Sequence, residues 1–274
     1  MNPLGINLWN WCAGLSEECL GLPEKVARMG FTAVELPMTQ PQVPSALADE
    51  IRNTGLGPGR DLSSFDSAVR ASTMDYLTTC LETAGQLGAG ILAGPLYTGG
   101  GKRHWLSPDE KKREWMLAVD GLRELARRAE HYGVVLSVEP LNRYRTSVAN
   151  TAGQVLRMVE EVDAPNVGVH FDTYHACLEE RDLCAALEQV LQAGKVNHFH
   201  ACANNRGAPG QGVVPWEDLL GLLVRYGYGG HITMETFALG GLDSSWVQVH
   251  SEPDELAREG LFYLQAFFKT KAGL

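Results

Sequence analysis

Residues 134–139 read Val-Val-Leu-Ser-Val-Glu, an apolar, β-branched run that ends at a carboxylate. Three later runs, residues 167–172, 196–200 and 231–235, have the same form, and each also ends at a potential metal ligand. Short apolar runs of this kind are typical of strands that are buried on both faces of a parallel sheet. The endings recur at intervals of about one strand and one helix, so these runs predict consecutive strands of an α/β fold.

Further strands are predicted upstream, at residues 4–8, 32–36 and 89–93. Between the strands, residues 116–129 and 155–162 carry apolar side chains at three- and four-residue intervals, as helices that cover a sheet do. Ser107-Pro108 and Thr151 have the residue types of helix starts.

The third strand is expected near Arg60–Leu62, because Leu56-Gly57-Pro58-Gly59 has the composition of a turn and leaves only a short segment to pair. Seven other strand-helix units require an eighth to close a barrel. No linker, repeat or change of composition divides the chain. We therefore predict one (β/α)₈ TIM barrel domain that spans residues 1–274.

Composition limits the function classes. The 274 residues are 45% hydrophobic, enough for a full core, and the formal charge of -10 leaves no basic excess for a nucleic-acid backbone. The six cysteines form no CxxC pair, which favours buried thiols in a reducing compartment. We find neither a signal peptide nor an apolar run of about 20 residues. We expect a cytoplasmic enzyme with a small polar substrate and with no membrane or nucleic-acid partner.

The four strand-end residues are Glu139, Asp172, His200 and Glu235, and the carboxyl ends of barrel strands meet at one rim. A single strand-end carboxylate is more often a helix cap or a surface ion pair, but four residues in register are hard to explain in that way. Three carboxylates brought together repel one another unless a cation lies among them. Oxygen ligands with one nitrogen favour Mn²⁺, Mg²⁺ or Co²⁺.

The motifs around these residues resemble the ketose 3-epimerase family, whose best-known members act on D-tagatose and D-psicose, within the xylose-isomerase-like barrels. The similar segments cover most of the chain and include residues 138–143, 171–175, 198–200, 205–206, 209–212 and 233–235. The resemblance implies one divalent ion, most typically Mn²⁺, that is bound by Glu139, Asp172, His200 and Glu235. It also implies a homo-oligomer, either a dimer or a tetramer.

The resemblance further implies that Glu139 and Glu235 are the acid/base pair, and that His175 and Arg206 hold ketose oxygens near the carbonyl. Inverting carbon 3 requires a base on one face, an acid on the other and stabilisation of an enediolate, which a divalent ion supplies as a Lewis acid. No organic cofactor is needed. The sequence therefore predicts a divalent-metal-dependent epimerase that acts on carbon 3 of a ketose or related keto-sugar.

Alternatives remain for the supporting residues. His175 has the position of a helix cap or of a partner to a ligand, and Arg206 lies in a Gly- and Asn-rich loop where it could be solvated. His198 shares a strand face with His200 and is expected to support it or to line the pocket. Arg145 stands where known epimerases carry an acidic residue that holds the terminal ketose oxygen. It either reads an anionic end of the substrate or turns outward.

Other functions fit the same residues. A ketose-aldose isomerase, a hydroxypyruvate-type isomerase and an inosose-type dehydratase all begin by abstracting a proton beside a carbonyl. An endonuclease on this barrel would need more His and Glu ligands, for which Glu35 and His104 are available, and a basic groove that the acidic composition disfavours. A catalytically silent sugar-binding protein is the third alternative.

Overall fold

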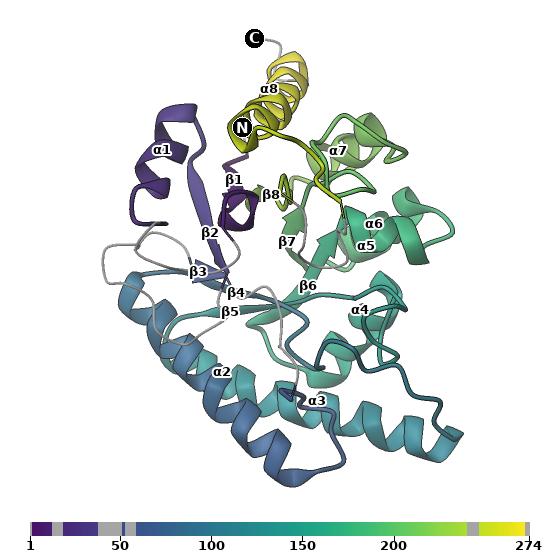
Figure 1. Ribbon diagram of the computed structural model, residues 1–274. Coiled ribbons are helices and arrows are strands. Elements are labelled where there is room, and N and C mark those ends of the chain that lie inside the picture. The colour runs from purple at the N-terminus through teal and green to yellow at the C-terminus, as the bar shows by residue number, and fades with distance from the viewer. Residues whose placement is uncertain (1, 13–18, 38–50, 53–58, 240–246, 272–274) are drawn as a thin grey trace.

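Parallel strands and helices alternate along the chain in a computed structural model that describes residues 2–12, 19–37, 51–52, 59–239 and 247–271 (Figure 1). The strands are β1 Leu4–Asn7, β2 Ala33–Pro37, β3 Ile51–Arg52, β4 Ile91–Gly94, β5 Val135–Val138, β6 Val167–Asp172, β7 Val196–His200 and β8 Ile232–Met234. They form one sheet in the order β3-β2-β1-β8-β7-β6-β5-β4, and every pairing in it is parallel.

The sheet curls into the predicted TIM barrel. The first strand pairs with the last, β1 with β8, and the two strands at the ends of the sheet order, β3 and β4, lie next to each other. No hydrogen-bonded register joins β3 to β4 within the described ranges. The fold class predicted from the apolar runs is confirmed.

Helices cover the outside of the barrel. They are the 3₁₀ helix η1 Leu8–Asn10 and the α-helices α1 Leu22–Met29, α2 Ser67–Leu87, α3 Pro108–His131, α4 Ala152–Val162, α5 Thr173–Glu179, α6 Leu183–Gln192, α7 Trp216–Arg225 and α8 Pro253–Lys271. The predicted helix starts are confirmed, since Ser107 and Thr151 each cap a helix in a reciprocal capping box with Glu110 and Gln154. No helix in these ranges is long and apolar enough to cross a bilayer.

The third strand was predicted in the wrong place. It is Ile51–Arg52, whereas residues 60–62 form a loop over the start of α2. In that loop the Asp61 N–H donates to Thr73 Oγ1 at 2.8 Å, and Leu62 is buried in the main apolar core. Leu62 thus serves helix packing and not strand pairing. Residues 56–58 of the turn predicted there lie outside the described ranges.

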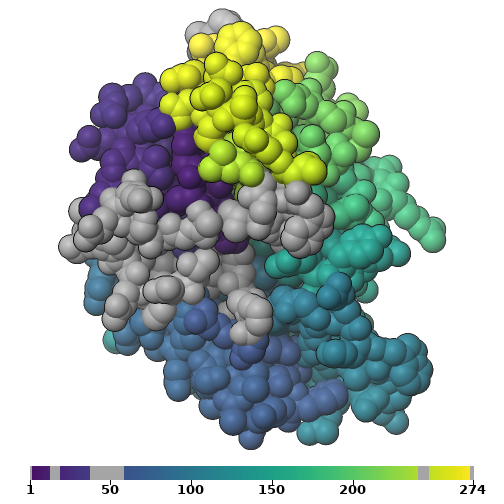
Figure 2. Space-filling view, viewed as in Figure 1, coloured from purple at the N-terminus to yellow at the C-terminus, as the bar shows by residue number. Residues whose placement is uncertain are grey.

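The N-terminal segment and the start of α8 meet on one side of the barrel. The Asn10 side chain donates to the Pro253 carbonyl at 2.8 Å, and the Trp11 indole N–H donates to Asp254 Oδ1 at 2.7 Å. Figure 2 shows the yellow surface of α8 resting against the purple N-terminal segment. These contacts tie α8 to η1 and the residue after it, which directly follow β1.

Side chains along β6 and β7 point alternately outward, to the apolar layer under the helices, and inward, to the polar interior of the barrel. Phe171 and Phe199 stack with ring centroids 5.8 Å apart and belong to the apolar core beneath the helices. The residues on either side of them in sequence face the opposite side of the strands, into the barrel. The interior therefore receives Asp172 and His200 at the top and, one layer below, His170 and His198, and both pairs are in register.

Candidate metal centre

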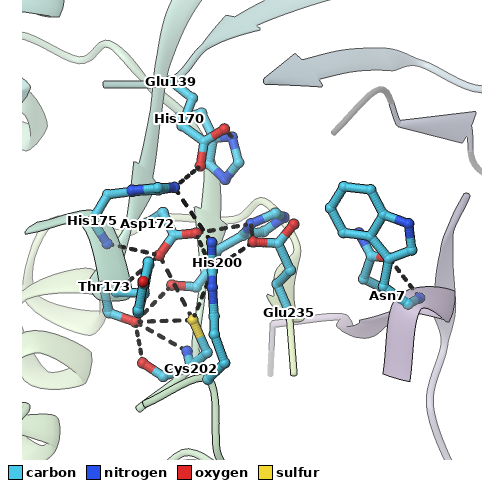
Figure 3. A network of polar contacts seen from close by, with 12 residues as sticks. Asn7, Glu139, His170, Asp172, Thr173, His175, His200, Cys202 and Glu235 are labelled. Carbon is cyan, nitrogen blue, oxygen red and sulfur yellow. Dashed lines mark hydrogen bonds and ion pairs between the residues drawn. The ribbon is translucent and has the colours of Figure 1, made fainter. Parts of the chain in front are cut away.

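Four buried side chains converge at the carboxyl ends of the last four strands. Glu139 and Glu235 directly follow β5 and β8, and Asp172 and His200 are the last residues of β6 and β7. Each offers one ligand atom, and these atoms all lie within 4.8 Å of one another. Figure 3 shows Asp172 and Glu235 beside His200, and Glu139 beside His170. The structure thus brings together all four residues that the sequence predicted as ligands.

His200 is oriented with one ring nitrogen toward the carboxylates. Its Nδ1 lies 3.4 Å from Asp172 Oδ2 and 3.3 Å from Glu235 Oε2 and makes no hydrogen bond. Its Nε2 faces Glu35, at 3.0 and 2.9 Å from the two carboxylate oxygens. A histidine that binds a metal commonly donates its other ring N–H to a carboxylate. This orientation leaves a lone pair on Nδ1 for a cation.

The two carboxylate oxygens of Asp172 have different partners. Oδ1 caps α5 by accepting the backbone N–H of Tyr174 at 2.6 Å and that of His175 at 3.3 Å. Oδ2 points into the cluster, where it accepts a hydrogen bond from Arg206. The helix-cap interpretation therefore holds for this residue, and its second oxygen stays in the candidate ligand group.

Arg206 is buried among the carboxylates. Its Nη1 donates to Asp172 Oδ2 at 2.9 Å and to Glu235 Oε2 at 2.7 Å, and its guanidinium stacks 3.9 Å from the Tyr174 ring centroid. The backbone at Arg206 has a φ of 65°, so the loop is bent to direct this side chain inward. The alternative of a solvated arginine is excluded.

Burial and mutual repulsion make the carboxyl groups unequal. Burial, with the charges of Asp172 and Glu235, raises the pKa of Glu139 well above its usual value. Burial also raises the pKa of Glu235, to about 7, despite the opposing charges of Arg206 and His200. Asp172 is equally buried, but Arg206 holds its pKa well below the usual range. Two carboxyl groups can therefore carry a proton near neutral pH while the third stays ionised.

His175 lies beside this cluster in a fixed orientation. Its Nδ1 accepts the Asn142 backbone N–H at 3.2 Å. Nε2 lies 3.8 Å from Glu139 Oε1 and 3.3 Å from Arg206 Nη2. His175 and Arg206 thus share the edge of the cluster nearest Glu139.

The other two predicted contact residues lie away from the cluster. His198 is one layer deeper and hydrogen-bonds Glu35 through Nε2 at 3.1 Å, so it supports the centre from below. Arg145 is partly exposed in the turn after β5, where its carbonyl accepts the Gly101 N–H at 2.8 Å. The structure does not place Arg145 in the group of four.

Sequence reasoning missed the role of Glu35, which it weighed only as an endonuclease ligand. Glu35 lies on β2 in register with Asn7 of β1, whose side chain donates to Glu35 Oε1 at 2.7 Å. A glutamate inside the apolar run of residues 33–37 was the available signal. His104 is exposed and belongs to neither candidate ligand group in the described residues.

The chain is similar to known proteins over most of its length. The model of the xylose isomerase-like TIM barrel family matches residues 23–267. A D-psicose 3-epimerase of Ruminiclostridium cellulolyticum is 30% identical, over 82% of this chain and 81% of the relative. An L-ribulose 3-epimerase of Mesorhizobium japonicum is also 30% identical, over 87% and 82%.

A solved structure shows the same arrangement of the backbone. The D-psicose 3-epimerase of Clostridium cellulolyticum H10, determined with D-tagatose, superposes with a TM-score of 0.87 at 26% identity and covers 97% of this chain and 99% of its own.

Proposed function

This chain belongs to the xylose isomerase-like TIM barrel family, and we propose that it is a divalent-metal-dependent epimerase that inverts carbon 3 of a free ketose. The named relatives above are 3-epimerases of ketoses, and they match most of the chain. The observation that carries the proposal is the buried group of Glu139, Asp172, His200 and Glu235 at the barrel mouth. The family is one of enzymes, so a catalytically silent binding protein is disfavoured.

The residues present fit a divalent ion. Three carboxylates and one imidazole lie within reach of one centre, and the Nδ1 lone pair of His200 is directed at two of the carboxylates. A set of three oxygens and one nitrogen suits Mn²⁺, with Mg²⁺ and Co²⁺ as alternatives. When bound, the ion supplies Lewis-acid stabilisation of the negative charge that develops on the substrate oxygens.

The proposed acid/base pair is Glu139 and Glu235. Because their pKa values are raised while that of Asp172 is lowered, each can accept or release a proton at neutral pH. In the proposed reaction one of them removes the proton on carbon 3, and the other returns a proton to the opposite face. Reversing the direction of reaction exchanges the two roles.

His175 and Arg206 are proposed to hold the substrate near its carbonyl. His175 Nε2 lies beside Glu139, and Arg206 presents a guanidinium to the same edge. Imidazole and guanidinium groups can both donate hydrogen bonds to carbonyl and hydroxyl oxygens. Arg145 is proposed to act farther from the reacting carbon, on the substrate's distal end.

Proton NMR of a ketose panel in D₂O tests the proposal. D-Psicose, D-tagatose and L-ribulose are each incubated with the Mn²⁺-loaded protein. We expect exchange of the hydrogen on carbon 3 together with the appearance of the 3-epimer. The Glu235→Gln variant, which keeps the size of the side chain but cannot cycle a proton, serves as the control and should show neither. Exchange at carbon 1 with formation of an aldose would instead identify a ketose-aldose isomerase.

A further inference from the structure

A second group of ligand-type side chains lies one layer below the candidate metal centre. It consists of His170, His198 and Glu35, which we call the histidine layer. His170 and His198 are paired in register on β6 and β7, each two residues before a member of the upper group. Their ring centroids are 4.7 Å apart, and all three side chains are buried.

His170 is the unusual member of this layer. It is 1% exposed, and neither ring nitrogen has a hydrogen-bond partner in the described part of the chain. Glu139 Oε2 lies 3.8 Å from its Nδ1, which is beyond hydrogen-bonding distance. A neutral imidazole has one donor and one acceptor, and leaving both unsatisfied in a protein interior is costly. A bound ion or water molecule beside His170 would satisfy these ring nitrogens.

The neighbouring donor atoms identify the kind of occupant. One nitrogen from each of His170, His198 and His200 lies within 4.8 Å of the other two. Glu35 Oε2 borders this group, at 3.1 Å from His198 Nε2 and 2.9 Å from His200 Nε2. Two imidazole nitrogens and one carboxylate oxygen form the ligand set that Zn²⁺ takes in many proteins, with a fourth position for water.

We propose that the histidine layer is a second divalent-cation site, held by His170, His198 and Glu35 and selective for a nitrogen-preferring ion such as Zn²⁺. It differs from the upper centre, where oxygens outnumber nitrogens three to one. Glu35 connects the two sites, because Oε1 accepts from Asn7 while Oε2 lies 3.1 Å from His198 Nε2 and 2.9 Å from His200 Nε2. An ion here fixes Glu35 and thereby the ring of His200. The inference does not depend on the reaction catalysed.

Metal content of the full-length chain tests this site. Metal-free protein is dialysed to equilibrium against Zn²⁺, and bound zinc per chain is measured by mass spectrometry. We expect two ions for the wild type, one for His170→Met and one for Asp172→Asn, which removes an upper ligand. The matched control His104→Met changes an exposed histidine and should retain two.

Cobalt absorption gives an independent reading that uses no variant of the histidine layer. Co²⁺ in a four-coordinate, nitrogen-rich site absorbs visible light much more strongly than Co²⁺ in a six-coordinate, oxygen-rich site. Asp172→Asn loaded with Co²⁺ should keep the strong band. One zinc per wild-type chain, or an Asp172→Asn protein without that band, would overturn the proposal, and an ordered water would then be the occupant beside His170. This result would leave the proposed epimerase function untouched.

Discussion

Glu35 Oε2 lies 2.9 Å from Nε2 of His200, so a carboxylate from the second strand orients an imidazole from the seventh. The charges of His200 and His198 hold the pKa of Glu35 well below its usual value in spite of its burial. Glu35 is thus ionised and accepts the Nε2 hydrogen of His200. The carboxyl group reaches the centre without belonging to the upper ligand group.

Replacing Glu35 by glutamine should weaken Mn²⁺ binding by about 10- to 100-fold, as loss of a partner to a metal-binding histidine does elsewhere. The amide keeps the size of the side chain but carries no charge to hold the His200 hydrogen. Calorimetric titration of the metal-free protein with Mn²⁺ measures the effect. Glu217→Gln, at an exposed position on α7, is the matched control. Equal affinities for the two variants would contradict the role given to Glu35.

Mn²⁺ affinity should rise with pH up to about 7. In the metal-free protein Glu235 has a pKa of about 7, and the pKa values of Glu139 and His200 are also raised, so protons must leave before these groups can bind an ion. The proton-bound forms dominate below their pKa values, and acid therefore competes with the metal. Dissociation constants measured at pH 5.5, 6.5 and 7.5 test this. A constant value across that range would show that the carboxylates are already ionised.

The same groups predict how the metal-free fold responds to pH. A carboxyl group whose pKa is higher in the folded chain than in the unfolded chain makes folding less favourable as pH rises between the two values. The shift of Glu235 from 4.5 to about 7 places this loss between those pH values. Asp172 and Glu35 have pKa values that are lowered in the folded chain, so these two groups make folding more favourable as pH rises, and they do so at lower pH. Thermal unfolding with and without Mn²⁺ should therefore show a metal-induced stabilisation that grows from pH 5 to pH 7.

Arg206→Met should destabilise the metal-free protein by about 3–5 kcal/mol, the usual cost of breaking a buried ion pair from one side. The guanidinium neutralises Asp172 and Glu235 directly, at 2.9 and 2.7 Å. A divalent ion supplies the missing positive charge, so Mn²⁺ should raise the melting temperature of the variant more than that of the wild type. Differential scanning calorimetry with and without Mn²⁺ measures both increments, and equal increments would rule out this electrostatic role.

The upper centre was predictable because it depends on strand order alone. Glu139, Asp172, His200 and Glu235 each end an apolar run, and parallel strands in a barrel bring such endings to one rim. The histidine layer was harder to foresee, since Glu35 meets His198 and His200 only after β2 and β7 have taken their places in the closed sheet. The position of the third strand was predicted wrongly for a local reason. Leu62 is apolar because it packs under helices, and a short apolar run does not distinguish a buried loop residue from a strand.

We predict that Arg145 influences which ketose end the protein accepts, and Arg145→Glu tests this by introducing the acidic side chain that the family resemblance places there. Arg145 is partly exposed in the turn after β5, so the substitution should fold normally. A carboxylate there can accept a hydrogen bond from the terminal hydroxyl of a neutral ketose, whereas a guanidinium can only donate and prefers an anionic group. We expect kcat/KM for D-psicose and D-tagatose to rise at least about tenfold, equivalent to about 1.4 kcal/mol. Arg145→Gln removes the charge without adding an acid, and it should show a smaller gain. If neither variant alters the ranking of a panel of neutral and acidic keto-sugars, the Arg145 side chain faces water and the substrate end is read by other residues.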